Sequence, residues 1–240
     1  MNYLALGVIA GLAAVERKGF LQAMLSRPIS LGAFAGLALG NVAAGLFVAA
    51  PLELLWLGSV NMGAALPVNE ALGTVAIAGG TVLGERTLLR LGLSGPQLLP
   101  AVAVLAVACC APLALVGRRT DRLVERWNER LFERAERELV AGAPEAAART
   151  NLYGLMLPFG ISFLLAPLGA AAAAALIAVV ARWVEVALPA LGLGWVAFAG
   201  FACASGARAM RAERAHFAYL AAIGIGLAAF AATALAGGRA

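Results

Sequence analysis

Charged residues are scarce in this chain of 240 residues. Asp, Glu, Lys and Arg make up 13% of it, hydrophobic residues make up 62%, and the mean hydropathy is +0.90. Soluble globular proteins carry about 25% charged residues, so this chain has too few polar side chains to cover a surface in water. The composition excludes a soluble globular protein and predicts an integral membrane protein.

Cysteine and histidine are also rare. The three cysteines lie in apolar runs without a CxxC spacing or a neighbouring histidine, which predicts buried thiols rather than a redox or metal site. The only histidine, His216, follows Arg214 at the start of the last apolar run, where we expect an interfacial position. No nucleophile–base pair is apparent. We therefore expect no enzyme activity, no cofactor and no metal.

Basic residues outnumber acidic ones by 18 to 13, but this surplus does not indicate a nucleic-acid partner. Many of the arginines lie between Arg118 and Arg149, where they alternate with acidic residues, so this segment is nearly neutral. Most of the other basic residues lie in short loops, as is usual on the cytoplasmic side of a membrane. We expect no nucleic-acid binding.

Apolar segments account for most of the chain. They cover residues 3–15, 29–50, 71–83, 98–116, 152–180, 184–206 and 217–236. A spanning helix needs about 20 apolar residues, and several of these segments are shorter or contain Gly and Pro. We predict an all-α, polytopic transmembrane helical bundle with short, broken or re-entrant segments, forming a single membrane domain over residues 1–240. The apolar N-terminus has no preceding basic region or cleavage site, so we expect a retained first helix.

The charged segment, residues 117–150, is predicted to be a cytoplasmic amphipathic helix or loop. Apolar residues recur at every fourth position in it, namely Leu123, Trp127, Leu131, Ala135 and Leu139. Arginines and glutamates run alongside, and opposite charges three or four residues apart stabilise a solvated helix. Two interpretations are open: a docking face for a partner or for anionic headgroups, or an ordinary solvated linker.

The stretch from Pro51 to Glu70 carries the candidate binding residues. Glu53 lies among Leu and Trp residues, far in sequence from any basic residue, and a carboxylate at bilayer depth usually marks a functional cavity. Prolines and glycines in 51–67 argue against an unbroken helix, and broken segments build binding sites in transporters. Asn61 and Asn69 add amides, which suit a neutral polyol because sugar hydroxyls both donate and accept hydrogen bonds. An ordinary loop with Glu53 at the interface is the alternative.

The first third of the chain contains a series of residues in a characteristic order. It consists of Arg27-Pro28, Gly36, Gly40-Asn41, Gly45, Leu52-Glu53, Leu57-Gly58, the run from Asn61 to Ala65, and Pro67. In this order and spacing the chain resembles the IIC membrane subunit of the mannose, fructose and sorbose family of phosphotransferase system (PTS) sugar transporters. The resemblance is strongest over residues 7–80 and stays collinear beyond, including the run from Leu188-Pro189 to Leu227.

The resemblance implies a sugar-permease subunit, multi-pass in the bacterial plasma (inner) membrane. Such a subunit binds a hexose and moves it inward together with a IID-like membrane subunit, in an oligomer. A cytoplasmic IIB protein, itself charged by IIA, phosphorylates the sugar on arrival, so the phosphoryl-carrying residues lie on those proteins. From the cavity argument and the resemblance together, we predict that Glu53, Asn61 and Asn69 contact the sugar, with Asn41 and Gln22 as further candidates.

Two of these positions depart from the family pattern. The family usually has aspartate where this chain has Asn41, and commonly has another close to the position of Asn69. An amide keeps the hydrogen bonds of a carboxylate but loses their charge-assisted strength. These departures motivate an alternative function, a divergent non-transporting membrane scaffold or sensor that keeps the IIC fold.

Overall fold

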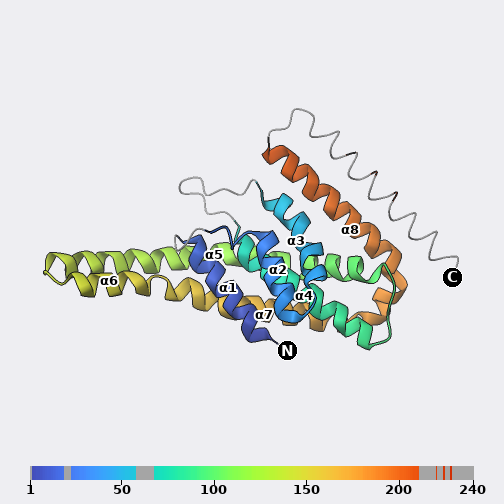
Figure 1. The fold of residues 1–240 in the computed structure, drawn as a ribbon, viewed down its shortest axis with the longest axis horizontal. Helices are drawn as coiled ribbons and strands as arrows, with labels where there is room; N and C mark the ends of the chain where they lie inside the picture. Colours follow the sequence, from blue (N-terminus) through green and yellow to red (C-terminus); the bar gives the residue numbers. More distant parts are fainter. Residues whose placement is uncertain are drawn as a thin grey trace.

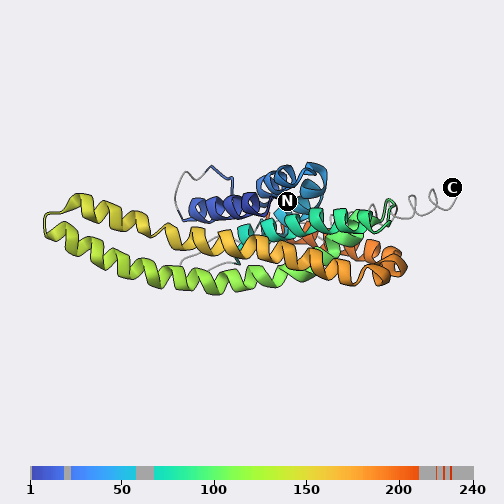
Figure 2. The same ribbon diagram turned by 90° about the horizontal axis from the view of Figure 1, so that it is seen from below.

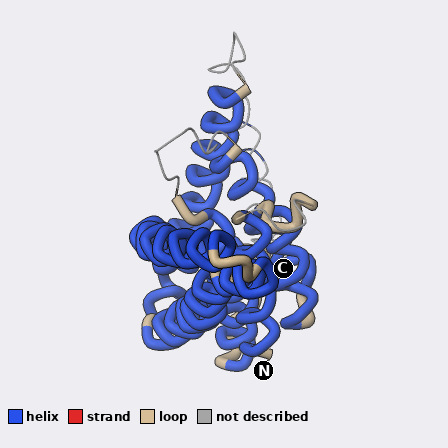
Figure 3. The backbone as a smooth tube through the Cα atoms, turned by 90° about the vertical axis from the view of Figure 1, so that its left-hand side faces the viewer, coloured by secondary structure: helices blue, strands red, loops and turns tan. Residues whose placement is uncertain are grey.

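The computed structural model describes residues 2–18, 23–57, 68–210, 220, 224 and 228, and all regular structure in these residues is helical. Figure 3 accordingly shows only helices and their connecting loops in the described part of the chain. The predicted all-α class is confirmed. The final predicted apolar segment, 217–236, falls almost entirely outside the described residues.

The first three helices are short. They are α1 (Tyr3–Arg17), α2 (Pro28–Leu39) and α3 (Val42–Trp56). At about 1.5 Å per residue each extends roughly 18–22 Å, which is less than the hydrocarbon core of about 30 Å. The prediction of short segments is confirmed.

Two turn residues divide the predicted apolar segment 29–50 into α2 and α3. Gly40 ends α2 with a φ of +80°, a conformation that glycine adopts without steric cost. Asn41 then caps α3 by accepting the Ala44 N–H at 3.0 Å. Pro51 does not end α3, which continues to Trp56, because neighbouring helices let a membrane helix tolerate the lost hydrogen bond. The rest of the predicted break, residues 58–67, lies outside the described residues.

The fourth helix, α4 (Glu70–Arg90), forms the centre of the bundle. Every residue from Ala71 to Gly84 is buried, and the helix packs against α1, α2, α3, α5 and α7. Its glycines allow close approach: a Cβ built at Gly79 would lie 2.9 Å from the Ala170 Cβ of α7. Small residues at helix contacts are the usual way in which helices associate in lipid.

The remaining helices are α5 (Leu98–Val140), α6 (Pro144–Tyr153), α7 (Met156–Val179) and α8 (Ala181–Ala209). Among the described residues, three helical stretches are long and apolar enough to cross a membrane: Leu98–Val140, Pro144–Val179 and Ala181–Ala209. Figure 1 shows α5 and α7 side by side along the longest axis, with α8 running obliquely to them.

The second half of α5 projects away from the bundle. With 43 residues, α5 is about 65 Å long, roughly twice the hydrocarbon thickness. The chain turns at Gly142, where φ is +76°, and α6 returns along α5. Figures 1 and 2 show this hairpin extending well beyond the other helices. We call residues 117–155 the arm; the charged segment is thus continuous with a membrane-spanning helix.

Only part of the apolar stripe predicted for the arm lies on the face that packs against the rest of the protein. Leu131 and Ala135 are half-buried, but Leu123, Trp127 and Leu139 are exposed. The packed face instead includes Asp121, Val124 and Asn128, at spacings of three and then four positions. A helix has 3.6 residues per turn, so a stripe at every fourth residue drifts around the helix and cannot remain on one face.

Candidate functional site

Glu53, the first predicted sugar-binding residue, forms an ion pair with Arg27 from the start of α2. The Arg27 Nε and Nη2 atoms both donate to Glu53 Oε1, the first at 2.8 Å, and the Ile29 N–H donates to Oε2 at 3.1 Å. The side chains of Arg27 and Glu53 are 28% and 22% exposed. Solvent or a ligand can therefore reach a carboxylate that already has a cationic partner.

Glu16 holds the chain that leads into α2. Its carboxylate is buried and accepts the backbone N–H groups of Leu25, at 2.8 Å, and of Ser26. Between α1 and this contact, Met24 adopts a positive φ of 58°. Glu16 and Glu53 together fix residues 25–29 in place. Gln22, a predicted sugar contact, is close in sequence but lies outside the described residues.

Asn41 joins the α2–α3 turn to the central helix. Its Oδ1 atom caps α3, and its Nδ2 atom donates to Glu85 Oε2 of α4 at 2.8 Å. From the next residue of the same helix, the Arg86 guanidinium donates to the Leu39 carbonyl at the end of α2. Both heteroatoms of the Asn41 amide therefore have partners within the protein.

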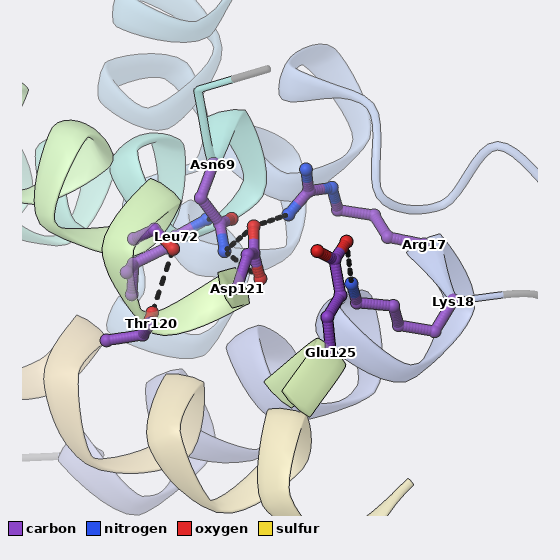
Figure 4. Close-up of polar contacts among 8 residues, drawn as sticks. Arg17, Lys18, Asn69, Leu72, Thr120, Asp121 and Glu125 are labelled. Atoms are coloured by element: carbon purple, nitrogen blue, oxygen red, sulfur yellow. Dashed lines mark hydrogen bonds and ion pairs between the residues drawn. The ribbon is translucent and has the colours of Figure 1, made fainter. Parts of the chain in front are cut away.

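Asn69 lies in a buried polar cluster at the base of the arm (Figure 4). Its Oδ1 atom caps α4 by accepting the Leu72 N–H at 3.0 Å, and its Nδ2 atom donates to both Asp121 oxygens, at 3.3 and 3.5 Å. Arg17 Nη1 donates to Asp121 Oδ2 at 3.5 Å. Asn69 and Asp121 are 3% and 6% exposed. The cluster connects the end of α1, the start of α4 and the arm.

The chain packs closely around this cluster. The Asn69 N–H donates to the Ala114 carbonyl of α5 at 3.2 Å. A Cβ at Gly117 would collide with the Asn69 Cβ, so glycine is required there for α5 to approach α4. Further along the arm, Lys18 pairs with Glu125 at 3.9 Å, and Figure 4 places this exposed pair beside the buried cluster.

The described candidate residues are not joined to one another by hydrogen bonds. Glu53, Asn41 and Asn69 each bond to a different set of partners, while Asn61 and Gln22 lie outside the described residues. Sequence reasoning assigned both asparagines to sugar contact and missed their role as helix N-caps, although Asn directly before an apolar helix is a recognised capping signal.

Sequence reasoning also missed the charged partners. Arg27, Arg17 and Asp121 come from segments 26 to 104 residues away from the groups that they contact, and no local pattern reveals such pairs. In the described part of the chain, no group of three or more His, Cys, Asp or Glu residues is arranged to hold a metal ion.

Comparison with known proteins identifies the family. The model of the sorbose-specific IIC components of the PTS matches residues 1–237. The chain belongs to this family. An Escherichia coli protein named as an N-acetylgalactosamine permease IIC component is 38% identical over 71 residues, 30% of this chain and 53% of that protein. The match therefore spans about half the length of that curated relative.

The chain was also compared with solved structures. A structure described only as a membrane protein superposes with a TM-score of 0.63 at 20% identity, over 88% of this chain and 80% of that one. A mannose transporter in complex with a microcin gives a TM-score of 0.43 at 20% identity, over 91% of this chain and 83% of that one. The first likeness supports the helical membrane fold.

The family fixes the broad class of the protein. It is a multi-pass membrane IIC component of a PTS, and it is not one of the phosphoryl-transferring subunits. The resemblance read from the first third of the sequence is thereby confirmed at the level of the family.

Proposed function

We propose that this IIC component binds a hexose at Glu53 and translocates it together with a IID-like membrane subunit. The observation that carries the proposal is the partly exposed Arg27–Glu53 pair on the short α2–α3 hairpin. A carboxylate offers about four acceptor positions, and the described residues occupy three of those on Glu53. Three of the five guanidinium N–H donors of Arg27 are not engaged with Glu53.

This combination suits a polyol. A sugar hydroxyl can donate to the remaining carboxylate position and accept from the guanidinium at the same time, so the pair offers both halves of the required hydrogen bonding. Arg27 also supports the geometry, because its two N–H groups hold the carboxylate in one orientation. In the proposal Arg27 positions Glu53 and shares the sugar with it.

The asparagines have a different place in the proposal. Asn61 and Gln22 complete the sugar contacts from the two segments that flank the hairpin in sequence. Asn41 and Asn69 act through the helix caps that their Oδ1 atoms form and through Glu85 and Asp121, to which their Nδ2 atoms donate. The phosphoryl donors are separate cytoplasmic IIA and IIB proteins.

Uptake of radiolabelled hexoses tests the proposal. Cells that express this chain with a IID-like subunit are expected to accumulate phosphorylated sugar, and cells that express either protein alone are not. Glu53→Gln is expected to lower uptake at least about tenfold, since each hydrogen bond to a charged group contributes about 1.5–3 kcal/mol. Glu145→Gln, at an exposed position of the arm, is the matched control and should transport normally.

Two results would overturn the proposal. Glu53→Gln with normal uptake would remove the proposed binding residue. Binding of a hexose without uptake in the presence of the IID-like subunit would favour the alternative, a scaffold or sensor that keeps the fold and moves nothing.

A further inference from the structure

The turn that leads into α2 presents two backbone N–H groups to one carboxylate. The Arg27 N–H closes this turn by donating to the Met24 carbonyl at 3.3 Å. The N–H groups of the two central residues, Leu25 and Ser26, both donate to Glu16 of α1, the first at 2.8 Å. Successive N–H groups of a turn that converge in this way form an anion-binding site. Glu16 occupies that site and holds the turn from outside.

Glu16 is buried without a cation. None of the ion pairs among the described residues includes it. A buried carboxylate costs free energy unless it is paired or hydrogen-bonded, so the two N–H groups of the turn are what stabilises its charge. The contact is therefore mutual: the carboxylate holds the turn, and the turn stabilises the carboxylate.

The helix that carries Glu16 is itself held on two sides. A Cβ at Gly11 would lie 2.7 Å from the Phe159 ring of α7, so α1 and α7 are in close contact. The residue after Glu16, Arg17, ties the same end of α1 to Asp121 of α5. Glu16 can therefore hold the turn at a defined place relative to the bundle.

The turn in its held position directs Arg27 to Glu53. Arg27 is the N-cap residue of α2, with an extended backbone at φ −68° and ψ 144°, the region to which the following Pro28 restricts it. Its guanidinium then reaches Glu53. Because backbone N–H groups engage both oxygens of Glu16, Arg27 pairs with Glu53 and not with the acid that holds its own turn.

We propose that Glu16 is a positioning residue for hexose binding and that it acts through Arg27. This inference rests on the function proposed above for the Arg27–Glu53 pair. With Glu16 in place, the pair is assembled before the sugar arrives. Without Glu16, the turn samples other conformations, and a hexose binds only the fraction of molecules in which the pair is assembled. The apparent affinity falls in proportion to that fraction.

The kinetics of hexose uptake test this role. Cells would express a IID-like subunit with the unchanged chain, with Glu16→Ala or with Glu16→Gln, which keeps one acceptor oxygen. The KM of uptake should rise at least about tenfold in Glu16→Ala, because a hydrogen bond to a charged group changes an equilibrium by at least that factor. It should rise less in Glu16→Gln. The maximal rate should stay unchanged, as when binding alone is weakened.

A matched control comes from the same end of α1. Lys18→Gln breaks the exposed pair with Glu125 and leaves the turn untouched, so its KM should equal that of the unchanged protein. Amide exchange gives the structural readout: Leu25 and Ser26 should exchange faster in Glu16→Ala, while exchange in α4 stays the same. Should α4 also exchange faster, the milder Glu16→Gln variant decides the KM comparison.

A double-mutant cycle shows whether Glu16 acts through Arg27. Arg27→Gln should raise KM by itself. Adding Glu16→Ala to Arg27→Gln should then change KM by less than about twofold, because residues that act through one another are not additive. Effects of the two substitutions that multiply would mean that Glu16 acts by another route, and would overturn the inference.

The remaining outcomes separate this inference from the proposed function. Normal uptake in Glu53→Gln would overturn both, because the pair would then have no role in binding. Impaired uptake in Glu53→Gln together with an unchanged KM in Glu16→Ala would overturn the role of Glu16 alone. A lower maximal rate with an unchanged KM in Glu16→Ala would also overturn it, since Glu16 would then affect a step after binding.

Discussion

The bundle and the arm differ in how many of their charged side chains have a hydrogen-bonding or ionic partner. In the bundle, Glu16 accepts two backbone N–H groups, Glu53 pairs with Arg27, and Glu85 accepts the Asn41 amide. On the arm, most arginines and glutamates have no ionic partner among the described residues, and Arg134–Glu138 is the only ion pair there that is internal to the arm.

The difference follows from the solvent. A charge at membrane depth costs several kcal/mol unless it is paired, and packing supplies such partners for Glu16, Glu53 and Glu85. Water solvates the charges of the arm, where an exposed ion pair contributes less than about 1 kcal/mol. Unpaired charges therefore cost little free energy on the arm, and they remain available to bind other molecules.

The largest expected effect on stability lies at the buried cluster around Asp121, where the arm joins the bundle. Asp121→Ala leaves the Arg17 guanidinium and the Asn69 amide without their buried acceptor. We expect the free energy of unfolding to fall by about 3–5 kcal/mol, as when one partner of a buried pair is removed. Thermal unfolding followed by tryptophan fluorescence measures it. Glu125→Ala, which breaks only the exposed pair with Lys18, should cost less than about 1 kcal/mol; equal losses in both variants would contradict the comparison.

Packing inside the bundle gives the second effect. A Cβ at Gly45 would lie 2.9 Å from the Gly36 Cα across the α2–α3 hairpin, so Gly45→Ala must push the two helices apart. The expected loss of unfolding free energy is about 1–3 kcal/mol. Gly160→Ala in α7, where no atom lies within 4 Å of the added methyl, should stabilise by up to about 1 kcal/mol. An unchanged free energy of unfolding in Gly45→Ala would show that the hairpin can accommodate the added methyl group.

Backbone conformation at the tip of the arm gives a smaller effect. Gly142 has a φ of +76° and open space around it, so Gly142→Ala costs only the strain of a left-handed residue, about 1–2 kcal/mol. Amide hydrogen exchange should rise in residues 134–150 and stay unchanged in α4. Faster exchange in α4 would mean that the arm and the bundle unfold together.

Acid should loosen the same tip slightly. The Thr150 hydroxyl, which donates to Glu138 at 2.7 Å, and then Arg134 lower the pKa of the Glu138 carboxyl. The ionised form therefore stabilises the α5–α6 contact above the ordinary glutamate pKa of about 4.3, and this contribution is lost as the pH falls through the lowered pKa.

Amide exchange in residues 134–150 measures the loss. Protection factors, in which the pH dependence of intrinsic amide exchange is divided out, should fall more between about pH 5 and pH 3 in the unchanged protein than in Glu138→Gln, which has no charge to lose at this position. Glu133→Gln, at an exposed position without a partner among the described residues, should behave as the unchanged protein. An identical pH response in Glu138→Gln would remove the proposed role of this contact.

Composition and apolar run length predict the class of fold, because lipid demands helices whose backbone bonds are internal. The sequence also contains a local signal for the break inside the apolar segment 29–50. Gly40, a typical C-cap residue, is followed directly by Asn41, a typical N-cap residue. The periodicity of the arm was misjudged because a spacing of four approximates, but does not equal, the helical repeat.

The candidate site was less predictable. The family resemblance and the isolated acid pointed to Glu53, but its pairing with Arg27 depends on how α2 and α3 pack, which no sequence pattern records. The position of Asp121 against Asn69 likewise depends on an α5 that runs unbroken from the membrane into the arm. Contacts between distant segments come from tertiary packing, and these contacts define the site.

The unbroken course of α5 has a mechanical consequence. A proline interrupts its hydrogen bonding at Pro112, and helices bend most readily at such positions. From there to Val140 the helix is a rigid lever about 42 Å long. A bend of about 5° at the proline would move the far end by about 4 Å, so a small rotation among the spanning helices becomes a large displacement at the tip.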